Sequence, residues 1–164
     1  MLPPLALSVR QPWAWAIIHG GKDIENRTAG SIRAGAMGLG PVAIHAATGM
    51  RQAEYQWAVW RLQRDGVRLP LPADLVRGAV IGRVEVVGIV EDSESPWFGG
   101  PCGLVLADPV AVEPVPSKGA LGYFRWQPGG QVAKPAAWMK GWQEAGLFQG
   151  LERGWKEPPG KPWG

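Results

Sequence analysis

Residues 7–28, which read LSVRQPWAWAIIHGGKDIENRT, hold the signals that decide how this chain folds. The apolar run at 7–9 is typical of the end of a strand. Pro12 follows it, and proline is tolerated in a first helical turn because its missing N–H would have no partner there. We therefore expect a helix that starts near Gln11 and ends at the glycine pair 20–21, where a glycine can adopt the left-handed conformation that closes helices.

The predicted helix is amphipathic. Trp13, Ala16 and Ile17 fall at positions i, i+3 and i+4, which gives one apolar stripe for the core. Trp15 lies about 200° from Trp13 around the helix axis, so only one of the two rings can face a given cleft. Packing in the core and stacking on a ligand both remain open for Trp13.

A charged segment follows the glycine turn. Side chains of a strand alternate, so if Ile24 points into the core, Glu25 and Arg27 share the opposite face, with Lys22 beside them at the turn. An ammonium and a guanidinium can contact anions, and a carboxylate can accept from the exocyclic amine of a base or act as a general base. An ordinary solvated strand, with Glu25 and Arg27 paired on an exposed face, is the alternative.

Several separated motifs resemble ASCH domains, small PUA-like β-barrels associated with RNA or nucleotide recognition. Ser-Val-Arg-Gln-Pro-Trp-Ala at 8–14 and Gly-Gly-Lys-Asp-Ile-Glu-Asn-Arg at 20–27 resemble the opening of the family. Residues 77–82, and 95–98 leading to 118–122, are similar to later segments, so the resemblance covers about residues 5–126. It implies a barrel in which the glycine-lysine turn and the charged strand line a cleft.

The composition favours one mostly β domain. A chain of 164 residues suits a single core, and 24 glycines with 16 prolines indicate many turns and short strands. No apolar run of about 18 residues suggests a membrane span, and no basic leader precedes an apolar stretch. Cys102 is the only cysteine, so an internal disulfide is impossible. We expect a soluble, cytoplasmic protein, and the net charge of +3 permits anionic partners without proving them.

The predicted fold class is α+β, mostly β: a small, closed PUA-like β-barrel of about six strands with two or three helices. Besides the opening elements, the expected strands lie at 41–46, 79–90, 103–106, 111–115 and 121–126. Residues 29–40, rich in glycine, are expected to form a mobile loop, and Thr48 is expected to cap a helix over about 50–64.

The composition changes after Trp126. We expect residues 1–126 to form the barrel domain and 127–164 a C-terminal extension, with one helix over 134–148 and a loose tail from Gly150.

Recognition of a splayed base needs a phosphate contact, a base-edge contact and a stacking face. The predicted ligand-binding residues supply all three: Arg10, Gln11, Trp13, Lys22, Glu25, Arg27, Trp97 and Phe98. The last two lie in a glycine-flanked loop and could form a lid. His19, His45 and Cys102 lack metal-ligand spacing, so we expect no metal and no cofactor, and we expect Cys102 to be buried and inert.

Three functions follow as hypotheses. The first is binding of RNA, single-stranded nucleic acid or a modified nucleoside. The second is a small amidohydrolase or ribonuclease using Lys22 and Glu25, because some ASCH members are similar to an acetylcytidine amidohydrolase. That enzyme uses a lysine, a threonine and a distant glutamate. Lys22 matches the lysine, Glu25 stands at the threonine position with Thr28 nearby, and Glu85 is the candidate for the distant carboxylate. The third is a protein-interaction module with a tryptophan-rich surface.

Overall fold

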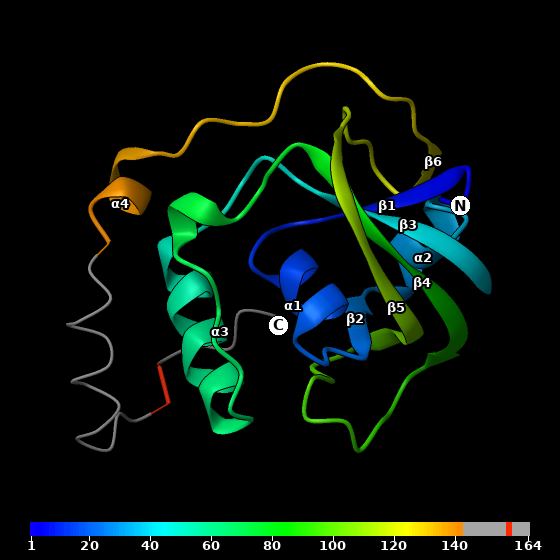
Figure 1. The fold of residues 1–164 in the computed structure, drawn as a ribbon. Helices are drawn as coiled ribbons and strands as arrows, with labels where there is room; N and C mark the ends of the chain where they lie inside the picture. Colours follow the sequence, from blue (N-terminus) through cyan, green and yellow to red (C-terminus); the bar gives the residue numbers. More distant parts are fainter. Residues whose placement is uncertain (143–156, 159–164) are drawn as a thin grey trace.

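Six strands form one curled, barrel-like sheet, in the order β2-β5-β4-β3-β1-β6 (Figure 1). The structure is a computed structural model that describes residues 1–142 and 157–158. It confirms the predicted class, an α+β fold that is mostly sheet. The strands are β1 (Leu5–Val9), β2 (Ile24–Arg27), β3 (Gly40–Ala46), β4 (Ala79–Val90), β5 (Cys102–Pro116) and β6 (Tyr123–Arg125).

Four α-helices and one 3-10 turn accompany the sheet in the described part of the chain: α1 (Trp13–His19), α2 (Ala29–Ala34), α3 (Gln52–Arg64), η1 (Pro72–Asp74) and α4 (Ala137–Lys140). Helix α1 starts after Pro12 and is followed by Gly21 at a φ of +76°, as the glycine signal predicts. None of the helices among residues 1–142 and 157–158 is long and apolar enough to cross a membrane.

The sheet is curled but open. Its ends are β2 and β6, which are short strands of four and three residues and do not pair with each other in the described chain. Strand β6 pairs only with residues 5–7 of β1, so the carbonyl of Ser8 is left on the open side and accepts a hydrogen bond of 3.1 Å from Arg27 of β2. The predicted full closure is therefore replaced by a side-chain bridge across a seam.

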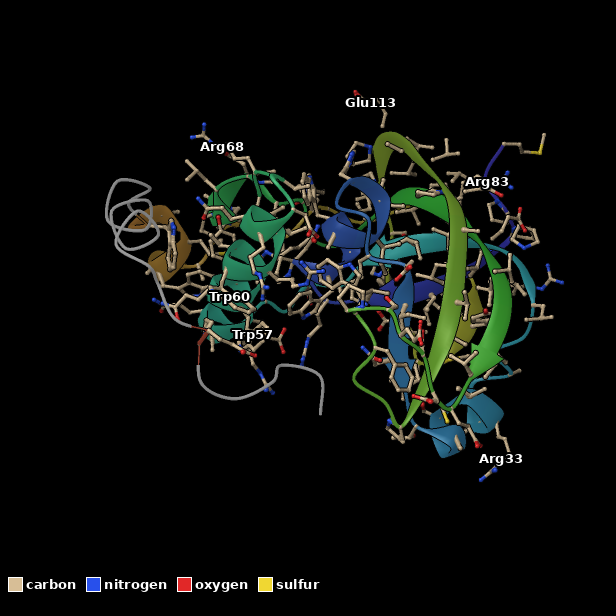
Figure 2. All side chains as sticks on the ribbon, turned by 90° about the horizontal axis from the view of Figure 1, so that it is seen from below. Arg33, Trp57, Trp60, Arg68, Arg83 and Glu113 are labelled. Atoms are coloured by element: carbon tan, nitrogen blue, oxygen red, sulfur yellow. The ribbon has the colours of Figure 1, made fainter. Side chains whose placement is uncertain are left out.

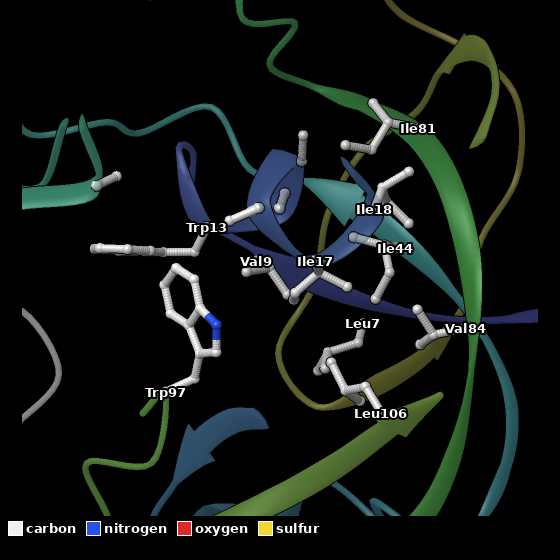
Figure 3. Close-up of a cluster of buried hydrophobic side chains, with 14 of the residues drawn as sticks. Leu7, Val9, Trp13, Ile17, Ile18, Ile44, Ile81, Val84, Trp97 and Leu106 are labelled. Atoms are coloured by element: carbon white, nitrogen blue, oxygen red, sulfur yellow. The ribbon is translucent and has the colours of Figure 1, made fainter. Parts of the chain in front are cut away.

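The main core lies between α1 and the concave face of the sheet (Figure 3). Ile17 and Ile18 of α1 are buried there against strand residues that include Leu7, Ile44 and Val84. Gly82 lets the helix approach β4, because a Cβ at that position would lie 2.6 Å from Cδ1 of Ile18. Close packing of this kind fixes α1 against β4.

Three predicted elements are corrected. Residues 29–34 form α2 within the expected loop, because the Thr28 hydroxyl caps the helix by accepting from the Ser31 N–H at 3.0 Å. The two short strands expected at 103–106 and 111–115 are one strand, β5, whose pairing with β4 shifts register and whose Asp108 has a φ of +52°. Arg51 takes the N-cap position of α3 that was predicted for Thr48, and its side chain makes no capping hydrogen bond.

Only part of the C-terminal prediction falls on described residues. Within the expected helix over 134–148, residues 137–140 are helical as α4, and residues 143–148 lie outside the described chain. The predicted tail from Gly150 is outside it too, apart from 157–158. Arg77 ties the approach to α4 to the barrel, because its guanidinium donates to the carbonyls of Thr48 and Lys134.

Candidate functional site

A recess of about 470 Å³ lies at the open seam of the sheet, where β1 leads into α1 and β2 passes opposite. Its volume is in the range of small-molecule sites, roughly 300 to 1,000 Å³. Five of the predicted ligand-binding residues line it. The full lining is Ser8, Val9, Arg10, Trp13, Lys22, Glu25, Asn26, Arg27 and Leu121.

Lys22, Glu25 and Arg27 form a chain of ion pairs in the recess wall. The ammonium of Lys22 lies 3.1 Å from Oε2 of Glu25 and also donates to the carbonyl of Ile24. The guanidinium of Arg27 lies 3.3 Å from Oε1 of the same carboxylate. Lys22 and Glu25 are only 4% and 8% exposed, so this strand is not the solvated charge alternation that was the alternative prediction.

The two cations keep Glu25 ionised. Burial by itself would raise the pKa of this carboxyl, but the charges and hydrogen bonds of Lys22 and Arg27 outweigh burial and hold the pKa below its usual range. Each carboxylate oxygen accepts one hydrogen bond from the protein and has capacity for another. Glu25 therefore offers a fixed, negatively charged acceptor to a ligand that brings N–H groups.

Arg10 reaches the recess from the start of α1 and pairs with Glu54 of α3. The arginine side chain is 44% exposed and the glutamate side chain 6%, so the cation faces the open side and the carboxylate is the buried partner. Burial raises the pKa of Glu54, against the opposing influence of Arg10 and Trp13. Sequence analysis missed Glu54, although it is the only acidic residue in α3.

Gln11 does not line the recess. Its side chain is buried, its amide nitrogen donates to the Val76 carbonyl at 2.8 Å, and its amide oxygen accepts from the Trp15 N–H at 3.0 Å. Both ends of the amide thus serve the protein itself. The residue joins α1 to the segment before β4, and the predicted base-edge contact has no support from its position.

Trp97 and Phe98 do not stand over this recess as the predicted lid. Trp97 is 2% exposed and packs behind Trp13, and its backbone carbonyl accepts from the side chain of Asn26 at 2.9 Å. Phe98 is partly buried and lines a different recess of about 360 Å³. That second recess lies against α3, which carries Trp57 and Trp60 (Figure 2).

The other residues considered for catalysis lie elsewhere or have structural partners. Thr28 caps α2, and Glu85 pairs with Arg83 at 3.0 Å on β4, outside the recess. Within residues 1–142 and 157–158, no group of three His, Cys, Asp or Glu residues could hold a metal ion. Cys102 is buried.

The half-buried Ser8 and the buried His45 form a pair beside the recess. The Ser8 hydroxyl lies 2.9 Å from Nδ1 of His45, and Nε2 lies 2.9 Å from the Ser117 carbonyl. Because a carbonyl only accepts, the proton is on Nε2, and Nδ1 accepts from the hydroxyl of Ser8. Burial lowers the pKa of His45, although the Ser117 carbonyl acts in the opposite direction, so the imidazole is neutral at pH 7.

Together, the fold and the recess define a small α+β domain that holds a ligand-sized, charged recess at the opening of a curled sheet. The chain matches no protein-family model, and no curated protein matches it.

Proposed function

We propose that the recess receives one unpaired nucleobase, presented by RNA, by another single-stranded nucleic acid or by a modified nucleoside. The observation that carries this proposal is the buried, ionised Glu25 held between Lys22 and Arg27 in the recess wall. Removing an ion pair from water has a desolvation cost, and such pairs with shifted pKa values are common at functional sites. The resemblance of residues 8–14 and 20–27 to ASCH domains supports the same assignment.

Each polar group has a role that fits a nucleotide. Glu25 accepts from the exocyclic amine of the base, and Arg27 donates to a neighbouring acceptor on the base edge. Arg10, whose guanidinium is partly exposed, contacts the phosphate. Trp13 borders the apolar side of the base.

The geometry gives the hydrolase less support. A lysine acting as a base or nucleophile needs a free amine lone pair, whereas Lys22 donates to both Glu25 and Ile24. A carboxylate with a lowered pKa, paired with two cations, is likewise a weak base. Binding without turnover is therefore the function we propose.

Titration calorimetry with the four nucleoside 5′-monophosphates and with short single-stranded RNAs tests the proposal. Glu25→Gln should weaken binding of bases that carry an exocyclic amine, and Arg10→Ala should weaken RNA binding and reduce its salt dependence by about one unit of slope. Arg83→Ala is the matched control, since Arg83 lies on β4 outside the recess, toward the other side of the molecule from α3 (Figure 2).

Two results would contradict the proposal. If no mononucleotide or RNA binds the wild-type protein, the recess has another ligand. If mass spectrometry shows product released from acetylcytidine or RNA, and Lys22→Ala abolishes that release while binding persists, the protein is a hydrolase.

A further inference from the structure

Leu121 is an apolar side chain at the mouth of a charged recess. It is 98% exposed, the highest value among the described large hydrophobic residues after the N-terminal Met1. It also lines the recess together with Arg10, Lys22 and Glu25. A single exposed leucine on a flat surface would need no explanation, but this one borders the proposed binding site.

The loop that carries Leu121 is fixed on both sides. Residues 118–121 are exposed, whereas Ser117 and Gly122 next to them are buried. The carbonyl of Ser117 contacts the His45 ring at 2.9 Å, and the Tyr123 N–H donates to the carbonyl of Gly35 at 2.9 Å. These contacts anchor the loop on β3 before Leu121 and next to α2 after it.

Two glycines allow the backbone of this loop to lie close against Ser8 and Gly35. A Cβ on Gly119 would lie 2.9 Å from the Ser8 hydroxyl oxygen, and a Cβ on Gly122 would lie 2.4 Å from Cα of Gly35. Gly122 also has a φ of +67°, which favours glycine. The loop therefore has little freedom to turn Leu121 inward, and the side chain remains in water beside the recess.

We propose that Leu121 packs against one face of the bound base. This inference rests on the proposed function and makes it more specific: the recess has charged groups for polar edges and, in Leu121 and Trp13, apolar groups for a flat face. A heteroaromatic base presents both features. A sugar phosphate presents only polar groups and would leave Leu121 exposed.

Calorimetry with matched probes tests this. Leu121→Ala should weaken the tightest-binding nucleoside 5′-monophosphate about tenfold, because the contact area with the base is lost. It should leave the affinity for ribose 5-phosphate, which lacks the base, unchanged. Leu121→Met should restore most of the nucleotide affinity. Leu39→Ala is the control, since Leu39 is 66% exposed and lies outside the recess.

The Leu121→Ala variant should fold normally, because Leu121 makes almost no contact with the rest of the protein. An unchanged Tm would verify this. If Arg10→Ala weakens nucleotide binding but Leu121→Ala does not, this inference is wrong and the proposed function stands. An equal loss for ribose 5-phosphate would also overturn it, because the loop would then act without touching a base. If no nucleotide or RNA binds the wild type, the proposed function and this inference both fail.

Discussion

Trp13 and Trp97 meet edge to face beside the recess, with ring centroids 6.4 Å apart and ring planes at 76° (Figure 3). The guanidinium of Arg61 also lies over the Trp97 ring, 4.8 Å from the ring centroid. A layered contact therefore runs from α1 through the 95–100 loop to α3. The orientation of Trp13, which lines the recess, depends on this layer.

We predict that Trp97→Ala destabilises the protein by about 3 to 5 kcal/mol, because it removes a fully buried aromatic ring. Urea denaturation followed by circular dichroism measures the change. Nucleotide affinity should fall as well, since Trp13 loses its support. Trp60→Ala is the comparison: Trp60 is only partly buried and lies on α3, so its loss should cost less. Equal costs for the two substitutions would show that the layer has no special role.

The buried ion pairs of Glu25 lead to a second prediction. Glu25→Gln leaves Lys22 buried without a carboxylate, and breaking a buried pair in this way costs about 3 to 5 kcal/mol. Glu85→Gln breaks the Arg83–Glu85 pair. Its N–O distance of 3.0 Å is similar, but both side chains are about one-third exposed. That change should cost less than about 1 kcal/mol.

Denaturant titrations of both variants at pH 7 measure this difference. A cost for Glu25→Gln as small as that for Glu85→Gln would mean that water reaches Lys22, against the burial described above.

A third prediction concerns acid. The pKa of His45 is lower in the folded protein than its ordinary value of 6.5. Just below pH 6.5, His45 is therefore protonated in the unfolded chain but still neutral in the folded protein. The free energy of unfolding should therefore fall as the pH drops below about 6.5, by up to about 1.4 kcal/mol per pH unit. The contribution of Glu25, whose folded pKa is lowered from 4.5, is retained in this window and is lost only at lower pH.

Stability measured from pH 7.5 to pH 5 checks this prediction. His45→Gln, which cannot titrate, should flatten the curve in that range even if it is less stable throughout. An unchanged pH dependence in His45→Gln would assign the acid sensitivity to another group.

Local signals predict the recess better than they predict what surrounds it. Proline and glycine placed α1 and the turn, and strand alternation placed Glu25 and Arg27 together, because each of these rules acts within a few residues. Glu54 reaches Arg10 only through the packing of α3, so no spacing in the sequence brings the two together. The position of Gln11 is likewise decided by a carbonyl 65 residues away.

The same distinction explains the errors in the sheet. The sequence pattern predicted two short strands at 103–106 and 111–115, yet Asp108 between them adopts a positive φ and β5 continues through the irregularity. The pairing partner β4 is what keeps these residues in one strand, and a partner strand is not visible in the local sequence.

The last prediction concerns the glycine under the loop of Leu121. Gly119→Ala should cost about 1 to 3 kcal/mol, because the new methyl group would lie 2.8 Å from Cε1 of His45 and must displace the loop or the ring. Gly38→Ala is the matched control, with nothing within 4 Å of the new methyl group, and should change stability by less than about 0.5 kcal/mol. Thermal denaturation compares the two, and calorimetry should show weaker nucleotide binding only for Gly119→Ala. Normal stability with normal binding in Gly119→Ala would mean that the loop moves freely, contrary to its fixed position over Ser8 and His45.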